Sequence, residues 1–296
     1  MPGISFTPLI VGCGDVGTRL GSELVRRGAR PVGLVRRQQS ADRISRWGIM
    51  PAVANLDRSV DEPPSAAEGG TVFYLVPPDG NADDDDPRLR NFLATCEQAV
   101  PRTLIYLGTS GVYGDCQGEW VNETRPPNPQ SDRARRRLAA EHIVAEWCGK
   151  RGVECMFLRV GGIYGPDRLP VDRVSRMAVI RPEEAPWSNR IHVDDLVRTL
   201  VHAARRGRAG RVYNVADGHP TTMTDYLYRV ADVTGLPRPR AVPLAEAPGQ
   251  LSEAMLSFVR ESRRLDVRRM REELGVNLQF PTLDTGLPDA WRRSRS

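Results

Sequence analysis

Three glycines near the amino terminus have the spacing of a loop that binds phosphate groups. The stretch GCGDVG places Gly12, Gly14 and Gly17 directly after an apolar run and directly before a helical pattern. In such a loop the first glycine allows a tight turn, the second lets backbone approach a diphosphate, and the third lets helix and strand pack closely. The first N–H groups of the helix, at Asp15 and Val16, would donate to the phosphates. This pattern predicts a dinucleotide site, with a plain turn as the alternative.

The residues that follow the second apolar run bear on which dinucleotide binds. An NAD site has Asp or Glu there to hold the ribose hydroxyls, whereas this chain has Val35, Arg36 and Arg37. Two guanidinium groups suit a 2′-phosphate through their charge and their forked donors. We predict NADP(H) as the cofactor and keep NAD(H) as the alternative. The simplest other interpretation is a pair of solvated arginines at a helix start.

The elements that must position these residues alternate between short apolar runs and helical patterns. The predicted strands are PLIVGCG, RPVGLVRR, MPAVANLD, TVFYLVPP, RTLIYLGTS and ECMFLRVGG. The predicted helices between them are DVGTRLGSELVRRG, RNFLATCEQAV and LAAEHIVAEW. Such alternation favours an α/β fold, in which ligands bind at the carboxyl ends of the strands. We expect a Rossmann-type doubly wound parallel sheet with a small C-terminal substrate lobe.

The texture of the sequence changes after about residue 165, where proline becomes frequent. We predict that residues 1–165 form mainly the dinucleotide-binding domain and residues 166–296 mainly the small lobe. Segments at about 188–217 are expected to return to the main sheet. The Pro-rich stretch LPRPRAVPLAEAPGQ is interpreted as a linker, and the acidic run from Asp83 to Asp86 as a solvated loop.

Composition limits the compartment and the partners. The chain has 296 residues and a formal net charge of +5, and its one lysine is Lys150. Five cysteines without a CxxC pair indicate buried, reduced thiols, and no metal site is predicted. No apolar run is long enough to span a membrane, and the first residues do not resemble a signal peptide. We expect a cytoplasmic protein that acts as a monomer or homodimer on a small molecule, without a nucleic-acid or membrane partner.

Four further motifs follow the glycine loop in a recognisable order. They are LGTSGVYGD (107–115), LRVGGIYGP (158–166), RIHVDD (190–195) and VYNVADG (212–218). In this order they resemble the extended short-chain dehydrogenase/reductases, the NAD-dependent epimerase/dehydratase family, from the first strand to about Gly286. The chain is most similar to the atypical bacterial members of uncertain activity that have the G-x-G-x-x-G loop.

The resemblance implies roles for individual residues. Asp57 would hydrogen-bond the adenine amino group, with a helix cap as the other interpretation. Val76 and Pro77 would lie beneath the cofactor ribose, and Thr109 would hold the substrate oxygen. The family's motifs also imply that three residues are structural: His192, Asp194 and Asp195.

Two departures from the family weaken the expectation of a sugar-nucleotide substrate. Gly162 stands where the family often has an asparagine that touches substrate, and Ser188 stands where it often has an arginine. Arg190 of this chain lies two residues closer to His192 than the family's arginine lies to the corresponding histidine. Trp187, Asn189 and Arg190 would line a pocket, with packing of Trp187 against the lobe as the alternative.

A more serious departure concerns the family's Tyr-x-x-x-Lys pair. In the family the tyrosine transfers a proton, and the lysine binds the nicotinamide ribose and lowers the tyrosine pKa. Alignment on the LAAE stretch puts Arg133 at the tyrosine position and Arg137 at the lysine position. Arg137 could still bind ribose, but a guanidinium is a poor proton shuttle. The phenols left for proton transfer are Tyr113 and Tyr164.

Three interpretations of the arginine-rich stretch therefore stay open. The first is an oxidoreductase or epimerase/dehydratase-like enzyme that acts on a hydroxyl or carbonyl group with atypical proton-transfer residues. The second is a non-catalytic NADP(H)-binding sensor or partner protein. The third is a solvated helix face, since helical spacing cannot point Arg133, Arg135, Arg136 and Arg137 in one direction.

Overall fold

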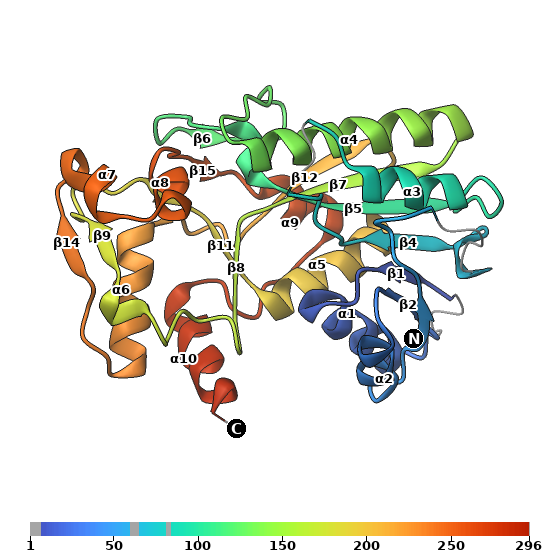
Figure 1. Ribbon diagram of the computed structural model, residues 1–296, viewed down its shortest axis with the longest axis horizontal. Helices are drawn as coiled ribbons and strands as arrows, with labels where there is room; N and C mark the ends of the chain where they lie inside the picture. The colour runs from blue at the N-terminus through green and yellow to red at the C-terminus, as the bar shows by residue number, and fades with distance from the viewer. Residues whose placement is uncertain (1–6, 60–64, 81–83, 296) are drawn as a thin grey trace.

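A parallel sheet of seven strands forms the centre of the computed structural model, which describes residues 7–59, 65–80 and 84–295 (Figure 1). The strand order is β12-β7-β5-β4-β1-β2-β3, which is the doubly wound order with one added strand. The strands are β1 (Leu9–Val11), β2 (Val32–Val35), β3 (Met50–Val53), β4 (Thr71–Tyr74), β5 (Thr103–Thr109), β7 (Glu154–Val160) and β12 (Arg211–Val215). The predicted α/β fold with a Rossmann-type sheet is confirmed.

Helices cover both faces of this sheet, so its strands are buried on both sides. Successive residues of β1 show this, because Leu9 and Val11 belong to one core and Ile10 to the other. The first core includes α3 (Pro87–Thr95) and α4 (Asp132–Arg151). The second includes α1 (Asp15–Arg26), α2 (Gln38–Ser45), α5 (Val193–Arg206) and α9 (Arg268–Leu274). Near-continuous apolar strand sequences are the consequence of this double burial.

Most of the remaining elements build a lobe beside the carboxyl edge of the sheet, drawn at the left of Figure 1. Its helices are α6 (Met223–Thr234), α7 (Ala247–Gln250), α8 (Glu253–Val259) and α10 (Leu283–Ser294). Four pairs of short strands are β6 (Trp120–Val121) with β15 (Arg264–Leu265), β8 (Gly162–Tyr164) with β11 (Arg190–His192), β9 (Ala178–Ile180) with β14 (Arg240–Val242), and β10 (Trp187–Ser188) with β13 (Thr221–Thr222). Single 3-10 turns are η1 (Ser65–Ala67), η2 (Ser110–Tyr113), η3 (Val174–Arg176) and η4 (Leu244–Glu246).

Two local expectations from the sequence are corrected. The Pro-rich stretch expected to be a linker contains β14 and α7, because parallel pairing with β9 gives it a structured partner. Asp83 lies outside the described residues, but Asp86 of the same acidic run is buried as the N-cap of α3. Its carboxylate accepts the Leu89 N–H at 3.1 Å, which satisfies a free donor of the first turn.

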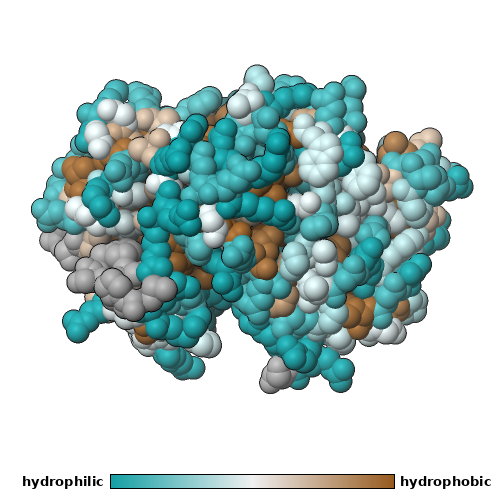
Figure 2. Space-filling model, turned by 180° about the vertical axis from the view of Figure 1, so that it is seen from behind, coloured by the Kyte–Doolittle hydropathy of each residue, from teal (hydrophilic) through white to brown (hydrophobic). Residues whose placement is uncertain are grey.

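The exterior and the thiols agree with the composition. Figure 2 shows a face that is mostly hydrophilic, with hydrophobic side chains visible mainly in the gaps between polar ones. Among the described residues, no helix combines the length and the apolar character that a membrane span needs. All five cysteines are buried and free, as predicted: Cys13, Cys96, Cys116, Cys148 and Cys155.

A buried ion pair fixes α4 against β7. Arg159 Nη2 of β7 lies 2.7 Å from Glu141 Oε2 of α4, and the two side chains are 7% and 6% exposed. The same guanidinium stacks on the ring of Tyr113, 4.8 Å from its centroid. Arg137 and Arg133 precede Glu141 by four and eight residues, so they lie on the same face of the helix. The pair therefore directs these two arginines toward the carboxyl ends of the strands.

Removing one partner of this pair tests its role. Glu141→Ala leaves the Arg159 charge buried without a counter-ion, so we expect the free energy of unfolding in urea to fall by about 3–5 kcal/mol. Glu146→Ala is the control, because Glu146 pairs with Lys150 on the exposed side of the same helix and should change stability little. Equal effects of the two substitutions would show that the buried pair does not hold the helix.

Candidate active site

Two cavities lie next to each other along the carboxyl edge of the sheet. The first, about 310 Å³, is formed by the ends of β1, β2 and β4 and is here called the nucleotide cavity. The second, about 290 Å³, is formed by the ends of β5 and β7 together with α4 and the lobe, and is called the arginine cavity. Because β4 pairs with β5, the strand ends that form the two cavities are neighbours in the sheet. Ligands of doubly wound sheets bind at this edge.

The glycine loop has the geometry that a diphosphate site requires. Gly12 has a φ of +94°, and a Cβ there would lie 2.9 Å from Val76 Cγ2. A Cβ on Gly17 would lie 2.5 Å from the carbonyl oxygen of Gly12, so close packing needs glycine there too. Gly14, the N-cap of α1, differs because a Cβ would meet nothing within 4 Å. The protein itself therefore requires two of the glycines, and the third leaves open space in front of the helix start.

The first helical residues, Asp15 and Val16, offer only their backbone to a ligand in the nucleotide cavity. The carboxylate of Asp15 lies 2.7 Å from both Arg19 Nε and Arg168 Nη1, outside the residues that line the nucleotide cavity. Burial raises the pKa of Asp15, but the two arginine hydrogen bonds outweigh it and leave the pKa below its usual value. Val16 packs against the core. Their free N–H groups at the helix N-terminus stay available to an anion.

The structure separates the two arginines that follow β2. Arg36 lines the nucleotide cavity, whereas Arg37 is the N-cap of α2 and is not among the lining residues. Two residues of α2 that the sequence analysis missed, Ser40 and Arg43, line the cavity in its place. Arg43 Nη2 lies 3.4 Å from the carbonyl oxygen of Cys13 in the glycine loop. Ser40 and Arg43 are three residues apart, so they lie on one face of α2. The sequence could have indicated this only if the start of α2 had been located.

Asp57 lies in the nucleotide cavity, but not at the end of a strand. Strand β3 stops at Val53, and both carboxylate oxygens of Asp57 meet arginines: Arg88 Nε at 2.5 Å and Arg36 Nη1 at 3.4 Å. The hydrogen bond from Arg88 holds the pKa of Asp57 below its usual value. Among the described residues no helix starts at Asp57, and its two expected roles, adenine contact and helix cap, stay predictions. Val76 and Pro77, just beyond β4, line the same cavity.

The arginine cavity collects Thr109 and four guanidinium groups. Arg137 Nη1 donates to the carbonyl oxygen of Leu107 at 2.9 Å, and Thr109 Oγ1 accepts the Gly111 N–H at 3.1 Å. The other guanidinium groups belong to Arg133, Arg190 and Arg263. Glu261 is the only carboxylate among the described lining residues, and it pairs with Arg263 at 2.7 Å. The cavity is therefore strongly cationic.

The two phenols expected to replace the family tyrosine lie outside the arginine cavity. Tyr113 is 1% exposed, and its hydroxyl donates to Asn214 Oδ1 at 2.8 Å. Tyr164 is fully buried in the core of the lobe, 3.4 Å from the carbonyl oxygen of Thr282. Burial raises the pKa of both phenols, which further disfavours proton release. Neither residue lines the cavity and both hydroxyls have partners elsewhere, so the structure does not support either phenol as the proton donor.

Residues next to the RIHVDD motif (190–195) line the arginine cavity or support the residues that line it. Trp187, Asn189 and Arg190 line the arginine cavity, as does Ser188, whose hydroxyl donates to the carbonyl oxygen of Thr221 at 2.9 Å. Gly162 lies beside them, and a Cβ there would come within 2.3 Å of Arg190 Nη1. Glycine at this position therefore makes room for the guanidinium of Arg190.

The acidic motif after β11 is structural, as predicted. His192 is the N-cap of α5, and its Nδ1 accepts the Asp194 N–H at 3.2 Å. The Asp195 carboxylate accepts the backbone N–H groups of Gln279 and Phe280 at 2.7 and 2.8 Å. These bonds tie α5 to the segment that leads into α10.

Comparisons with known proteins agree with this architecture. A solved structure of a functionally unknown conserved protein from Silicibacter pomeroyi is 30% identical, covers 99% of this chain and all of its own, and superposes with a TM-score of 0.82. MoeE5, solved in complex with UDP-glucuronic acid and NAD, is 24% identical with a TM-score of 0.77 over 98% of this chain and 99% of its own.

Among curated proteins, a 4-hydroxy-2-methyl-3-oxo-4-farnesyl-3,4-dihydroquinoline-1-oxide ketoreductase from Stigmatella aurantiaca is 24% identical over 76% of this chain and 72% of its own. The dTDP-glucose 4,6-dehydratase of Streptomyces griseus matches at 27% identity, but over only 38% of its own length and 39% of this chain. The model of the NAD dependent epimerase/dehydratase family matches residues 9–216, more than half of the chain. With the glycine loop, the doubly wound sheet and the adjoining cavities, this match places the chain in the NAD-dependent epimerase/dehydratase family.

Proposed function

We propose that the protein is an NADP(H)-dependent oxidoreductase or epimerase/dehydratase-type enzyme that acts on a hydroxyl or carbonyl group of a small molecule in the arginine cavity. The observation that carries the proposal is the adjacency of the two cavities along one sheet edge, the first with the glycine loop and the second with Thr109. A nicotinamide cofactor that extends from the first cavity would present its reactive ring to the second.

The charges of the nucleotide cavity support NADP(H) over NAD(H). Asp57 pairs with both Arg36 and Arg88 and offsets part of their charge, whereas Arg43, among the described residues, donates to the carbonyl oxygen of Cys13 and has no carboxylate partner. Arg36, Arg43 and the Ser40 hydroxyl together offer forked donors and positive charge where the adenine ribose of a bound dinucleotide would lie. A 2′-phosphate would complete this set of donors.

The chemistry divides between the cofactor and the chain. The cofactor supplies or accepts a hydride when it is bound. Thr109 would hold the substrate oxygen, and the Arg137 guanidinium would bind the cofactor ribose and stabilise negative charge that develops on that oxygen. The remaining hydroxyls and Glu261 are the groups of the cavity that could carry a proton.

A second candidate is a protein that binds NADP(H) without turnover. It is favoured by one observation: among the described residues that line the arginine cavity there is no tyrosine, histidine or lysine. Guanidinium groups remain protonated and supply charge without proton transfer.

Alanine substitutions at Gly14 and Gly17 distinguish a role in ligand contact from a role in packing. Gly14→Ala should lower stability by less than about 1 kcal/mol, because its Cβ meets nothing in the protein. It should nevertheless weaken NADP⁺ at least about tenfold, because the methyl group would stand where the diphosphate approaches. Gly17→Ala should cost about 1–3 kcal/mol of stability through its clash with the Gly12 carbonyl oxygen. Calorimetric titration and urea unfolding measure both, and full NADP⁺ affinity in Gly14→Ala would argue against the loop as the diphosphate site.

Cofactor choice is tested at the end of β2. Arg36→Ala and Arg43→Ala should each weaken NADP⁺ about 10- to 100-fold, since each removes a charge-assisted contact, and should change NAD⁺ affinity little. Arg37→Ala is the matched control, because Arg37 does not line the cavity. Equal losses for the two dinucleotides would mean that these arginines do not bind a 2′-phosphate.

Turnover decides between the two candidate functions. NADPH oxidation is measured across a panel of carbonyl compounds, and NADP⁺ reduction across the matching alcohols. An enzyme should lose about 100-fold in kcat/KM on Thr109→Ala, since a donor to the reacting oxygen is removed. Thr124→Ala, an exposed threonine outside both cavities, is the control. Tight NADPH binding with no turnover anywhere in the panel would favour the second candidate.

A further inference from the structure

We propose that the arginine cavity binds the anionic group, a carboxylate or a phosphate, of a compact substrate, and that the buried guanidinium of Arg190 is its main contact. The proposal rests on the proposed function, because the cavity that holds the anion also holds Thr109. It narrows the substrate to a small molecule that carries both an acid group and a hydroxyl or carbonyl group.

The state of Arg190 carries this inference. Arg190 is 7% exposed, and no carboxylate of the described residues lies within 4.0 Å of its guanidinium. Nη1 reaches the carbonyl oxygen of Asn189 at 3.3 Å, and Nη2 lies 3.1 Å from the sulfur of Met223. Nε is buried without a hydrogen-bond partner among the described residues. A buried charge without a counter-ion is costly, and a ligand that brings the missing anion removes that cost.

Neighbouring aromatic and acidic groups do not neutralise this charge. The guanidinium stacks on Tyr226, 4.3 Å from the ring centroid, which contributes a cation–π contact but no counter-charge. Asp217 is an acidic neighbour: its backbone N–H donates to the Arg190 carbonyl oxygen at 2.7 Å, and its carboxyl acts electrostatically on the guanidinium without forming an ion pair within 4.0 Å. Burial raises the pKa of Asp217 to about 7, so near neutral pH this carboxyl is partly protonated.

The other three arginines of the cavity add to the positive charge. Within the described part of the chain, Arg137 hydrogen-bonds only to oxygens of Leu107 and Tyr106, and Arg133 stacks on Phe258 at 4.7 Å from the ring centroid. Arg263 uses Nη1 for Glu261 and the Gly114 carbonyl oxygen, and its buried Nε has no partner among the described residues. Four guanidinium groups thus surround one carboxylate, which attracts anions and suits bidentate binding of an acid group.

The size of the cavity argues for a compact ligand. Its volume of about 290 Å³ is at the lower end of the range for small-molecule sites. Trp187 and Phe258, both partly exposed, line it beside the arginines. A small hydroxy acid, oxo acid or phosphorylated alcohol fits this volume and this charge.

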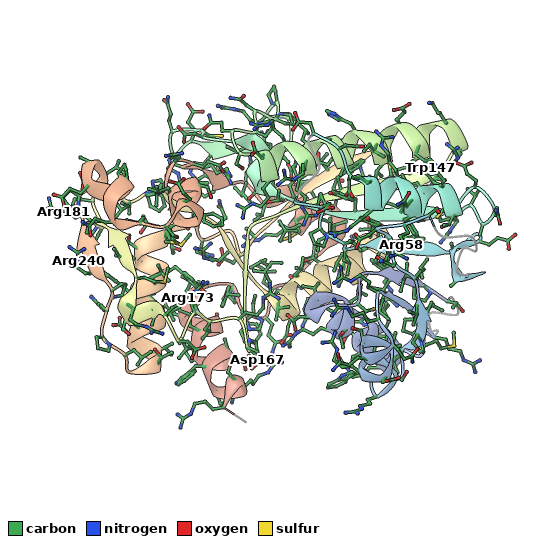
Figure 3. The ribbon with its side chains drawn as sticks, in the orientation of Figure 1. Arg58, Trp147, Asp167, Arg173, Arg181 and Arg240 are labelled. Atoms are coloured by element: carbon green, nitrogen blue, oxygen red, sulfur yellow. The ribbon has the colours of Figure 1, made fainter. Side chains whose placement is uncertain are left out.

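The test uses the full chain with and without saturating NADP⁺, titrated calorimetrically with malonate, inorganic phosphate and the neutral malonamide. We expect malonate or phosphate to bind and malonamide not to bind, and the tighter of the two anions identifies the acid group. Arg190→Gln should weaken that anion about 10- to 100-fold and leave NADP⁺ affinity unchanged. Arg181→Gln, at the outer edge of the lobe in Figure 3, is the matched control and should change neither.

Two outcomes would overturn the proposal: no anion binding by the native chain, or anion binding that survives in Arg190→Gln. If Arg190→Gln does not fold, Arg190→Lys replaces it, because lysine keeps the charge but lacks the forked donors, and unchanged anion affinity in that variant then overturns the proposal. Failure of the proposed function looks different: whatever the anion titration gives, the native chain would then bind neither pyridine nucleotide, or would bind NADPH without turnover anywhere in the substrate panel.

Discussion

The buried ion pair between Arg159 and Glu141 is the contact on which the active-site edge depends. It joins β7, the strand next to edge strand β12, to the helix α4 that packs on it, and its two side chains are almost fully enclosed. Because an unpaired charge at this depth would be strongly destabilising, α4 has one favourable register on β7. That register points Arg137 and Arg133 into the cavity beside Thr109, while Arg135 turns outward to pair with Asp132.

The chain combines the cofactor architecture of its family with different side chains at the reacting end. The glycine loop and the ends of β1, β2 and β4 form the cavity suited to a dinucleotide. A Cβ on Gly12 or Gly17 would clash with neighbouring atoms, which is why glycine is needed at both positions. One strand further along, Arg133 and Arg137 line the cavity at the positions where the resemblance to the family implies a phenol and an amine. The exchange keeps positive charge at the site and removes the usual proton carrier.

This exchange gives the substrate cavity a consistent character. Arg190 and Arg263 come from the lobe side, Arg133 and Arg137 come from α4, and Gly162 leaves the space that the Arg190 side chain needs. Positive charges converge from distant parts of the chain into a small volume. An anionic ligand would reduce their mutual repulsion most readily, and the charge of the cavity therefore agrees with the proposed substrate.

The sequence by itself determined the fold class, the glycine loop, the six predicted strands and the family, because these follow from local spacing and alternation. It also located Arg36, Thr109 and Arg137. Only the tertiary structure decided that Arg43 takes the place of Arg37 and that Tyr113 is buried against Arg159. The reason is physical: a local pattern fixes which face a residue occupies, but the neighbours of that face come from segments far away in the chain.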